Sequence, residues 1–235
     1  MSILIEATDN SVVTLHGQYR QSNGNRFASA KDSVDAVVRA LDVSAALMLL
    51  VLLAPLLLCI ILAIVVEDSG KILFSQKRVG KDGRPFACLK FRTMVPDAED
   101  RLAEILAADE ARCAEWRTDR KLRDDPRVTR LGRILRRTSL DELPQLLNVL
   151  RGEMSLVGPR PIVPGEVPLY GRYIGSYYAV RPGLSGLWQV SGRNDVSYKR
   201  RIAFDVYYER RRSLPLYLII IMKTPGCLLL ARGCY

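Results

Sequence analysis

The sequence is poor in the residues that most often carry acid-base and nucleophilic catalysis. It has one histidine, His16, in a polar N-terminal stretch. This scarcity argues against a Ser-His-Asp triad, a Cys-His pair or a set of histidine metal ligands. The cysteines are odd in number and lie far apart without a C-x-x-C pair: Cys59, Cys88, Cys113, Cys227 and Cys234. We therefore expect no disulfide framework and no zinc site, and any acid-base or nucleophilic work must fall to carboxylates.

The sequence also lacks the two glycine-rich loops that commonly bind nucleotides, G-x-x-x-x-G-K-[ST] and G-x-G-x-x-G. What is present is a globular composition of 235 residues, 49% hydrophobic and 26% charged, which is enough for one sizeable core or two small domains. An excess of 35 Lys and Arg over 25 Asp and Glu gives a net charge of +10. This charge predicts an anionic partner, either nucleic acid, an anionic membrane face or a phosphorylated substrate.

A long uncharged run dominates the first third of the chain. Residues 1 to about 30 are polar and lack the pattern of a signal peptide, so we expect a loose tail there. The 24 residues from Val43 to Val66 then carry no charge. As a helix they would extend about 36 Å at ~1.5 Å per residue, against roughly 30 Å of membrane hydrocarbon. We expect this run to lie in a membrane, because a soluble core helix is rarely so apolar for so long.

Pro55 falls in the middle of this run and predicts a kink, because proline removes one backbone hydrogen bond and clashes with the preceding turn. The helix then either spans the membrane or enters and returns to the same face. Seven Lys or Arg between residues 71 and 92, against Asp82 alone, predict that the downstream domain faces the cytoplasm. Residues 1–40 are charge-balanced, so bilayer physics alone mildly favours a span.

Three further segments have recognisable patterns. The apolar stretch Leu214–Met222 is too short to cross a membrane and is interpreted as either an interfacial anchor or a core helix. Residues 97 to about 120 have the periodicity of a solvated amphipathic helix. The segment 152–192 is rich in Gly and Pro, which favours extended loops folded over a site.

The segment 127–160 contains the residues best suited to chemistry. Arginines recur every three or four positions, which predicts one basic stripe on a helix: Arg127, Arg130, Arg133 and Arg136 or Arg137. Ser139 and Glu142 have the spacing of a capping box, while Leu143-Pro144 offers a second helix start. Either start places Asp141 and Glu142 at the positive end of a helix, which favours both carboxylates and a bound phosphate. The simpler alternative is that these two acids only cap the helix.

Further arginines in the loops favour a chemical role for the acidic pair. Arg136 and Arg137 come just before the pair, while Arg160, Arg181 and Arg193 lie in loops whose Gly and Pro residues let the backbone approach a ligand closely. The guanidinium fork suits phosphate oxygens. An acidic pair in such surroundings predicts a divalent ion together with a carboxylate nucleophile that acts on a phosphoanhydride. Mg²⁺ is the expected ion, since it needs only one or two carboxylates and completes its shell with phosphate and water.

Several longer motifs carry a family resemblance. They are R-x-x-D at Arg39 and Asp42, the apolar run with its proline, KFRTM at 90–94, TSLDELPQLLNVLRGEMSLVGPRP at 138–161 and RPGLSGLWQVSGRN at 181–194. With these motifs, the chain from about Arg39 to Tyr208 resembles the bacterial sugar transferases, the monotopic polyprenyl-phosphate phosphoglycosyl transferases that begin exopolysaccharide and glycan assembly.

The resemblance implies that a sugar 1-phosphate passes from a UDP-sugar to undecaprenyl phosphate, with release of UMP. It implies that Asp141 attacks the sugar-side phosphorus to form a covalent intermediate, that Glu142 holds or polarises neighbouring groups, and that Mg²⁺ binds at Asp141. Arg136, Arg160 and Arg193 match the family's phosphate-contacting positions, and we add Lys90, Arg92 and Arg181 as substrate-binding candidates.

The resemblance also implies that the helix bent at Pro55 is re-entrant. One departure concerns the residue before this proline, which is usually Ser in the family and is Ala54 here. The serine hydroxyl that would help satisfy the broken turn is therefore missing, so the stability of the bend rests on Pro55 and on packing.

Together these expectations define a mainly α fold with short β elements. The chain divides into a tail (1–30), a re-entrant membrane helix (31–70) and a cytoplasmic catalytic domain with an interfacial C-terminal segment (71–235). The expected location is the inner membrane, and the expected partners are a UDP-sugar (galactose or glucose, by analogy), undecaprenyl phosphate and membrane lipids, without nucleic acid. A homo-oligomer is left open. The alternative function is a membrane-tethered protein that holds anionic lipid or nucleic acid without turnover.

Overall fold

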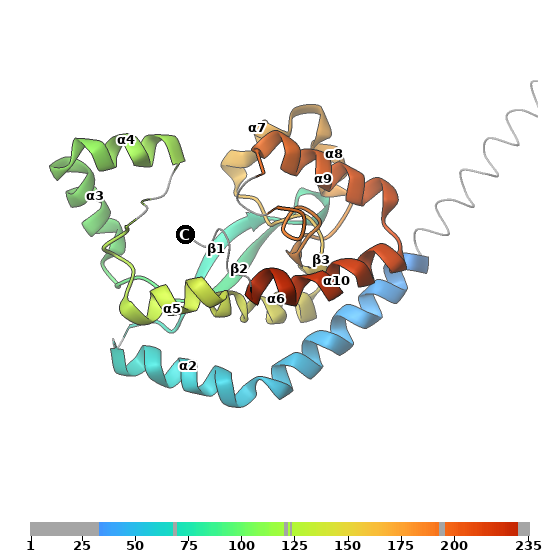
Figure 1. Ribbon diagram of the computed structural model, residues 1–235, viewed down its shortest axis with the longest axis horizontal. Coiled ribbons are helices and arrows are strands. Elements are labelled where there is room, and N and C mark those ends of the chain that lie inside the picture. The colour runs from blue at the N-terminus through green and yellow to red at the C-terminus, as the bar shows by residue number, and fades with distance from the viewer. Residues whose placement is uncertain (1–32, 68–69, 120–121, 123, 193–195, 230–235) are drawn as a thin grey trace, which may run out of the picture.

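The structure is a computed structural model that describes residues 33–67, 70–119, 122, 124–192 and 196–229. Its described part is mainly helical with two small sheets, as predicted (Figure 1). The predicted tail, residues 1–30, lies outside the described residues. In Figure 1 a long bent helix runs beneath a body of shorter helices and strands.

The bent helix confirms the predicted kink at Pro55. Its two parts, Ser33–Leu52 and α2 (Ala54–Glu67), meet at an angle of 62°. The hydrogen bonds from Leu53 N to Leu49 O and from Leu57 N to Leu53 O, both 2.8 Å, continue the helix on either side. Pro55 lacks an N–H, so the carbonyl one turn earlier loses its donor and the axis bends there. Within the described ranges, no single helix has the length and apolar character to cross a membrane, but this pair together does by length and composition.

Two polar residues fix the first part of this helix to the body. Arg39 donates to the carbonyl oxygens of Val149 and Leu150, at 2.6 and 3.0 Å. The Asp42 carboxylate is 1% exposed and accepts hydrogen bonds from the Leu156 N–H and the Tyr217 hydroxyl, at 2.9 and 2.8 Å. Arg39 and Asp42, the two charged residues of the R-x-x-D pattern, therefore join the bent helix to three separate segments of the body, where their hydrogen-bond partners lie.

The bent pair has one packed face and one exposed face. Ala46 belongs to the main core, while Ile60 and Ile64 pack with Phe91 and Leu135. On the other face, large apolar side chains are exposed: Leu47, Met48, Val51, Leu52, Leu56, Leu58, Leu62 and Val66. A row of this length is unusual on a surface that meets only water.

A β-hairpin stands at the centre of the body. Strands β1 (Leu73–Val79) and β2 (Pro85–Phe91) pair antiparallel around the short helix η1 (Lys81–Gly83). The chain continues into α3 (Ala98–Ala108) and α4 (Glu110–Asp119). The expectation of one helix over 97–120 is wrong, because Asp109 between them adopts extended backbone (φ −135°, ψ 107°).

The next segment brings the acidic pair to the hairpin. Helix α5 (Arg130–Thr138) leads into η2 (Leu140–Glu142) and α6 (Gln145–Arg151), and both η2 and α6 pack against β2. The predicted capping box is not formed. Ser139 ends α5 in the left-handed conformation (φ 57°), its side chain makes no capping hydrogen bond, and the following helix begins only after Pro144.

The Gly- and Pro-rich segment 152–192 folds into short elements, where extended loops were expected. They are β3 (Ser155–Val157), η3 (Pro164–Glu166), α7 (Val167–Tyr170), η4 (Gly171–Tyr173), α8 (Ile174–Tyr178) and β4 (Gly183–Ser185), with β3 and β4 parallel. Tyr177 ties this segment to the hairpin by donating to Val79 O at 2.7 Å.

Two helices complete the body, α9 (Tyr198–Arg211) and α10 (Leu214–Leu229). Helix α10 buries Tyr217 and Ile220 in the main core, as the core-helix interpretation predicts. Its other face exposes Leu218, Ile219 and Met222. The interfacial role of that face stays a prediction.

Candidate active site

Lys90 joins the two carboxylates singled out in the sequence. Its Nζ lies 2.7 Å from Oε1 of Glu142 and 3.5 Å from Oδ2 of Asp141. Asp141 is 7% exposed, and Glu142 is partly buried beside it. The lysine comes from strand β2 and the acids from η2, so the pairing depends on how the hairpin packs against the turn after α5.

Asn148 is hydrogen-bonded to the backbone of β2 next to Lys90. This α6 residue is completely buried, accepts a hydrogen bond from Leu89 N at 3.0 Å and donates to Ala87 O at 2.8 Å. Its amide group therefore makes the hydrogen bonds with the edge of β2 that a third strand would otherwise make, immediately before Lys90. A second bond from the same Nδ2 to Glu153 Oε2, at 2.6 Å, holds the side chain in this orientation. We therefore infer a positioning role for Asn148, which lies inside the 138–161 motif but gave no sequence signal of that role.

Arginines surround the carboxylate pair. Arg136, on the last turn of α5, donates from Nε to Thr93 Oγ1 at 2.9 Å, and its charge acts on Asp141. The charges of Arg160 and Arg78 act on Glu142. Arg78, on β1, is held by a 2.8 Å hydrogen bond to Pro161 O. Arg78 was not among the predicted site residues, because its proximity to the acids follows only from the pairing of β1 with β2.

The surroundings shift the pKa values of the two acids in opposite directions. Burial raises the pKa of Asp141, and the negative charge of Glu142 adds to this, although Lys90 and Arg136 oppose it. Burial also disfavours the charged form of Glu142, but the positive charges of Lys90 and Arg160 outweigh it and lower the pKa of that carboxyl. Two adjacent acids with separated pKa values are typical of sites where they have different roles.

Other predicted site residues lie elsewhere or outside the described ranges. Arg92 follows β2, and its guanidinium lies against Gly70, in the link from α2. Arg181 donates from Nε to Gly152 O at 2.9 Å and lines a pocket that does not include the carboxylate pair. Arg193 falls outside the described residues. Of the predicted arginine stripe, Arg127 is not on α5: it is buried and paired with Asp125, whose carboxylate lies 2.6 Å away.

The carboxylate pair suits the expected Mg²⁺ in its type of donor, since this ion needs only one or two carboxylates. Among the described residues, no group of three or more His, Cys, Asp or Glu side chains could hold a metal. The remaining ligands would therefore have to be substrate phosphate and water. The arrangement combines a buried carboxylate, a second ionised carboxylate and several cations, which is suited to binding an anionic substrate and attacking it.

Comparison with known proteins gives consistent results. The family model described as "Bacterial sugar transferase" matches residues 33–231. "Exopolysaccharide production protein ExoY" of Sinorhizobium fredii is 50% identical over 197 residues, covering 84% of this chain and 87% of the relative. "Undecaprenyl-phosphate galactose phosphotransferase" of Salmonella typhimurium is 45% identical over 206 residues, which are 88% of this chain but 43% of the longer relative. "UDP-glucose:undecaprenyl-phosphate glucose-1-phosphate transferase" of Caulobacter vibrioides is 44% identical over 213 residues, 86% and 73% of the two chains.

Proposed function

The chain belongs to the bacterial sugar transferase family, and from this we propose that it transfers a hexose 1-phosphate from a UDP-sugar to undecaprenyl phosphate, releasing UMP. The product would be a diphosphate-linked lipid sugar, the first membrane intermediate of an exopolysaccharide. The names of the relatives support these substrates. Galactose and glucose are the leading candidates for the sugar, since the name of one relative contains galactose and the name of another contains glucose.

The reaction proceeds in two steps through Asp141. An oxygen of the Asp141 carboxylate attacks the sugar-side phosphorus of the UDP-sugar. The bond from this phosphorus to the bridging oxygen breaks, and UMP leaves with the electron pair. A phosphate oxygen of undecaprenyl phosphate then attacks the same phosphorus, which breaks the aspartyl bond and restores the carboxylate. The observation that carries this assignment is the burial of Asp141 beside Lys90, with the charge of Arg136 acting on it. A poorly hydrated carboxylate is a better nucleophile, and nearby cations reduce its repulsion from an anionic substrate.

The neighbouring residues neutralise charge around this reaction. Glu142, ionised and paired with Lys90 at 2.7 Å, holds the lysine beside Asp141. Arg136 and Arg160 bind phosphate oxygens of the substrates and so reduce the repulsion between the carboxylate and the phosphoanhydride. When bound at Asp141, Mg²⁺ would neutralise further negative charge on those oxygens.

The bent helix pair supports a membrane location beside the lipid substrate. We propose that the pair enters the cytoplasmic leaflet with its exposed apolar face and returns to the same side, while the exposed face of α10 lies at the interface. Cysteines introduced near residue 20 and at Asp82 in a cysteine-free background would test this topology. Both should react with a membrane-impermeant reagent only from the cytoplasmic side, and reaction from opposite sides would restore a spanning helix.

Replacing Asp141 by Asn tests the enzymatic function. UMP release from UDP-galactose or UDP-glucose should fall to background, because an amide cannot act as the nucleophile, while membrane association persists. Asp100→Asn, the same substitution on the exposed face of α3, is the matched control. Wild-type rates of UMP release in the Asp141→Asn variant would refute the proposed enzymatic function and favour a binding protein.

Trapping the intermediate tests the mechanism separately. Enzyme incubated with a UDP-sugar and no lipid acceptor should gain the mass of one hexose phosphate on Asp141, and hydroxylamine should remove it because acyl phosphates react with this reagent. An adduct on another residue, or none under conditions in which UMP is released, would contradict the two-step route.

A further inference from the structure

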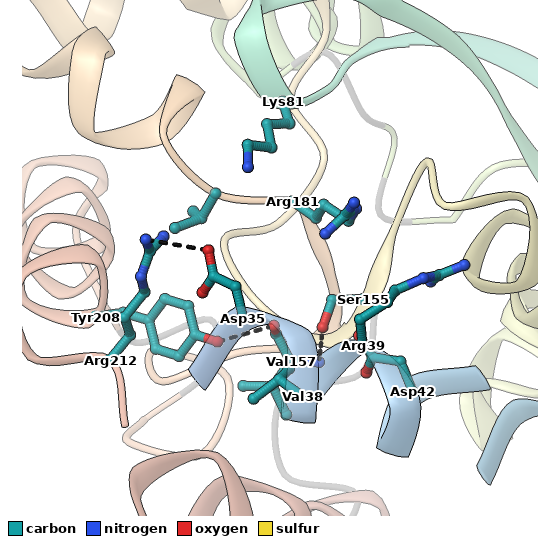
Figure 2. Close-up of a pocket in the computed structure, with 11 residues that line it drawn as sticks. Asp35, Val38, Arg39, Asp42, Lys81, Ser155, Val157, Arg181, Tyr208 and Arg212 are labelled. Atoms are coloured by element: carbon teal, nitrogen blue, oxygen red, sulfur yellow. Dashed lines mark hydrogen bonds and ion pairs between the residues drawn. The ribbon is translucent and has the colours of Figure 1, made fainter. Parts of the chain in front are cut away.

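A charged pocket lies apart from the carboxylate pair, beside the start of the described N-terminal helix. It is formed by that helix together with η1, β3, the segment before β4 and the end of α9, and it includes Arg39, Lys81, Arg181 and Arg212. In Figure 2, Lys81 and Arg181 approach it from the side opposite to the helix that carries Asp35 and Arg39. None of Lys90, Asp141 and Glu142 lines it.

The positive charges of this pocket outnumber its negative charges. Four cations face two carboxylates, Asp35 and Asp42. Asp35 is engaged by Arg212, at 3.1 Å. Asp42 is already bonded to the Leu156 N–H and the Tyr217 hydroxyl. The pocket is therefore electropositive without a substrate bound.

Arg39, Arg181 and Lys81 face only one further carboxylate, Asp42, so these groups together keep a net positive charge. Arg39 and Arg181 donate to the neutral carbonyls of Val149, Leu150 and Gly152, at the end of α6. Each guanidinium has five N–H donors, so most of them remain for another acceptor. Burial and the charge of Arg181 lower the pKa of Arg39, which indicates that the two cations oppose one another.

The Lys81 ammonium group has no hydrogen-bond or ion-pair partner in the part of the chain that the structure describes. An anion bound between Lys81 and the two guanidinium groups would satisfy all three cations. Because Lys81 is the member of the pocket that holds no other segment in place, it can be replaced with the least effect on the fold.

The position of the pocket along the helix indicates where this anion comes from. Arg39 lies four residues before Val43, the start of the uncharged run, which is about 6 Å along a helix. A helix that enters the membrane at Val43 places the pocket at the depth of lipid headgroups, where Lys and Arg side chains meet phosphate.

We propose that this pocket binds the headgroup phosphate of an anionic membrane phospholipid and so holds the N-terminal helix in register with the body. The proposal rests on the membrane location argued above, but not on the transfer reaction. A free phosphate ion offers the same chemistry from another source, so the experiment must separate the two.

The test measures lipid binding by the full chain in a neutral detergent, without UDP-sugar. Native mass spectrometry and the thermal unfolding midpoint are followed during titration with phosphatidylglycerol, phosphatidylcholine or inorganic phosphate. Phosphatidylglycerol should be retained and should raise the midpoint, while the other two should not. Lys81→Gln should weaken phosphatidylglycerol binding about tenfold, as expected for loss of a charge-assisted contact.

Two further variants make the result decisive. Lys77→Gln removes the same charge from an exposed position of β1 outside the pocket and should bind as the wild type, while Lys81→Arg should retain most of the affinity. Equal loss in Lys77→Gln and Lys81→Gln, equal binding of phosphatidylcholine, or equal stabilisation by inorganic phosphate would each overturn the proposal. Because UMP release is not measured, failure here would leave the proposed transferase function standing.

Discussion

Replacing Lys90 by Gln removes an ammonium group that contacts both carboxylates. Its Nζ lies 3.5 Å from Oδ2 of Asp141, a separation at which unit charges attract by about 5 kcal/mol at an effective dielectric constant of 20 and by about 1 kcal/mol in water. The pKa of Asp141, already raised by burial, should therefore rise further when this attraction is lost.

The sign of the effect on activity follows from the role proposed for Asp141. The nucleophile must be ionised, so a raised pKa moves the acidic limb of the pH–rate profile to higher pH. The assay is UMP release from a UDP-sugar by solubilised enzyme, measured as kcat/KM across the pH range in which the protein stays folded. The acidic limb of the Lys90→Gln profile should lie at a higher pH than that of the wild type, and the variant should be less active at neutral pH.

Lys77→Gln serves as the matched control, because it removes an exposed lysine from the neighbouring strand of the same hairpin. Its profile should overlay the wild-type profile. If Lys90 only binds substrate phosphate, KM will rise in Lys90→Gln while the acidic limb stays in place. That result would refute the coupling of Lys90 to the ionisation of Asp141.

Three further substitutions test the supports of the site and of the fold. Asn148→Leu leaves the Leu89 N–H and the Ala87 carbonyl without their partner and should lower the free energy of unfolding by about 2–4 kcal/mol in denaturant titrations. Gly132→Ala should destabilise by about 1–3 kcal/mol by the same measurement, despite the better helix propensity of Ala, because the added methyl group would overlap the Thr93 carbonyl. Burial raises the pKa of Asp205 to about 7, so the folded state binds a proton that the unfolded state releases above about 4, and stability should fall between pH 4 and pH 7. Asp205→Asn should remove this slope from thermal unfolding midpoints, and an unchanged slope would contradict it.

The elements predicted most successfully were those whose structure depends on residues adjacent along the chain. The uncharged run and Pro55 predicted a bent helix, which the 62° angle confirms. The predicted capping box failed because it rests on a local rule that tertiary packing overrode. The spacing of Ser139 and Glu142 is that of a capping box, but the chain turns through a left-handed Ser139 so that η2 can pack against β2. The same packing brings the Asp141 and Glu142 carboxylates to Lys90, 51 and 52 residues away along the chain.

The amino-acid sequence by itself determined the family, the bent apolar helix and the acidic pair, because periodicity, proline and motif spacing are properties of adjacent residues. Only the tertiary structure decided which cations meet that pair and how each carboxyl ionises. Lys90 and Arg78 reach it through the hairpin, whereas Arg181, equally prominent in the sequence, lines another pocket. Burial and charge separation depend on distances across the fold, and residue spacing along the chain does not specify those distances.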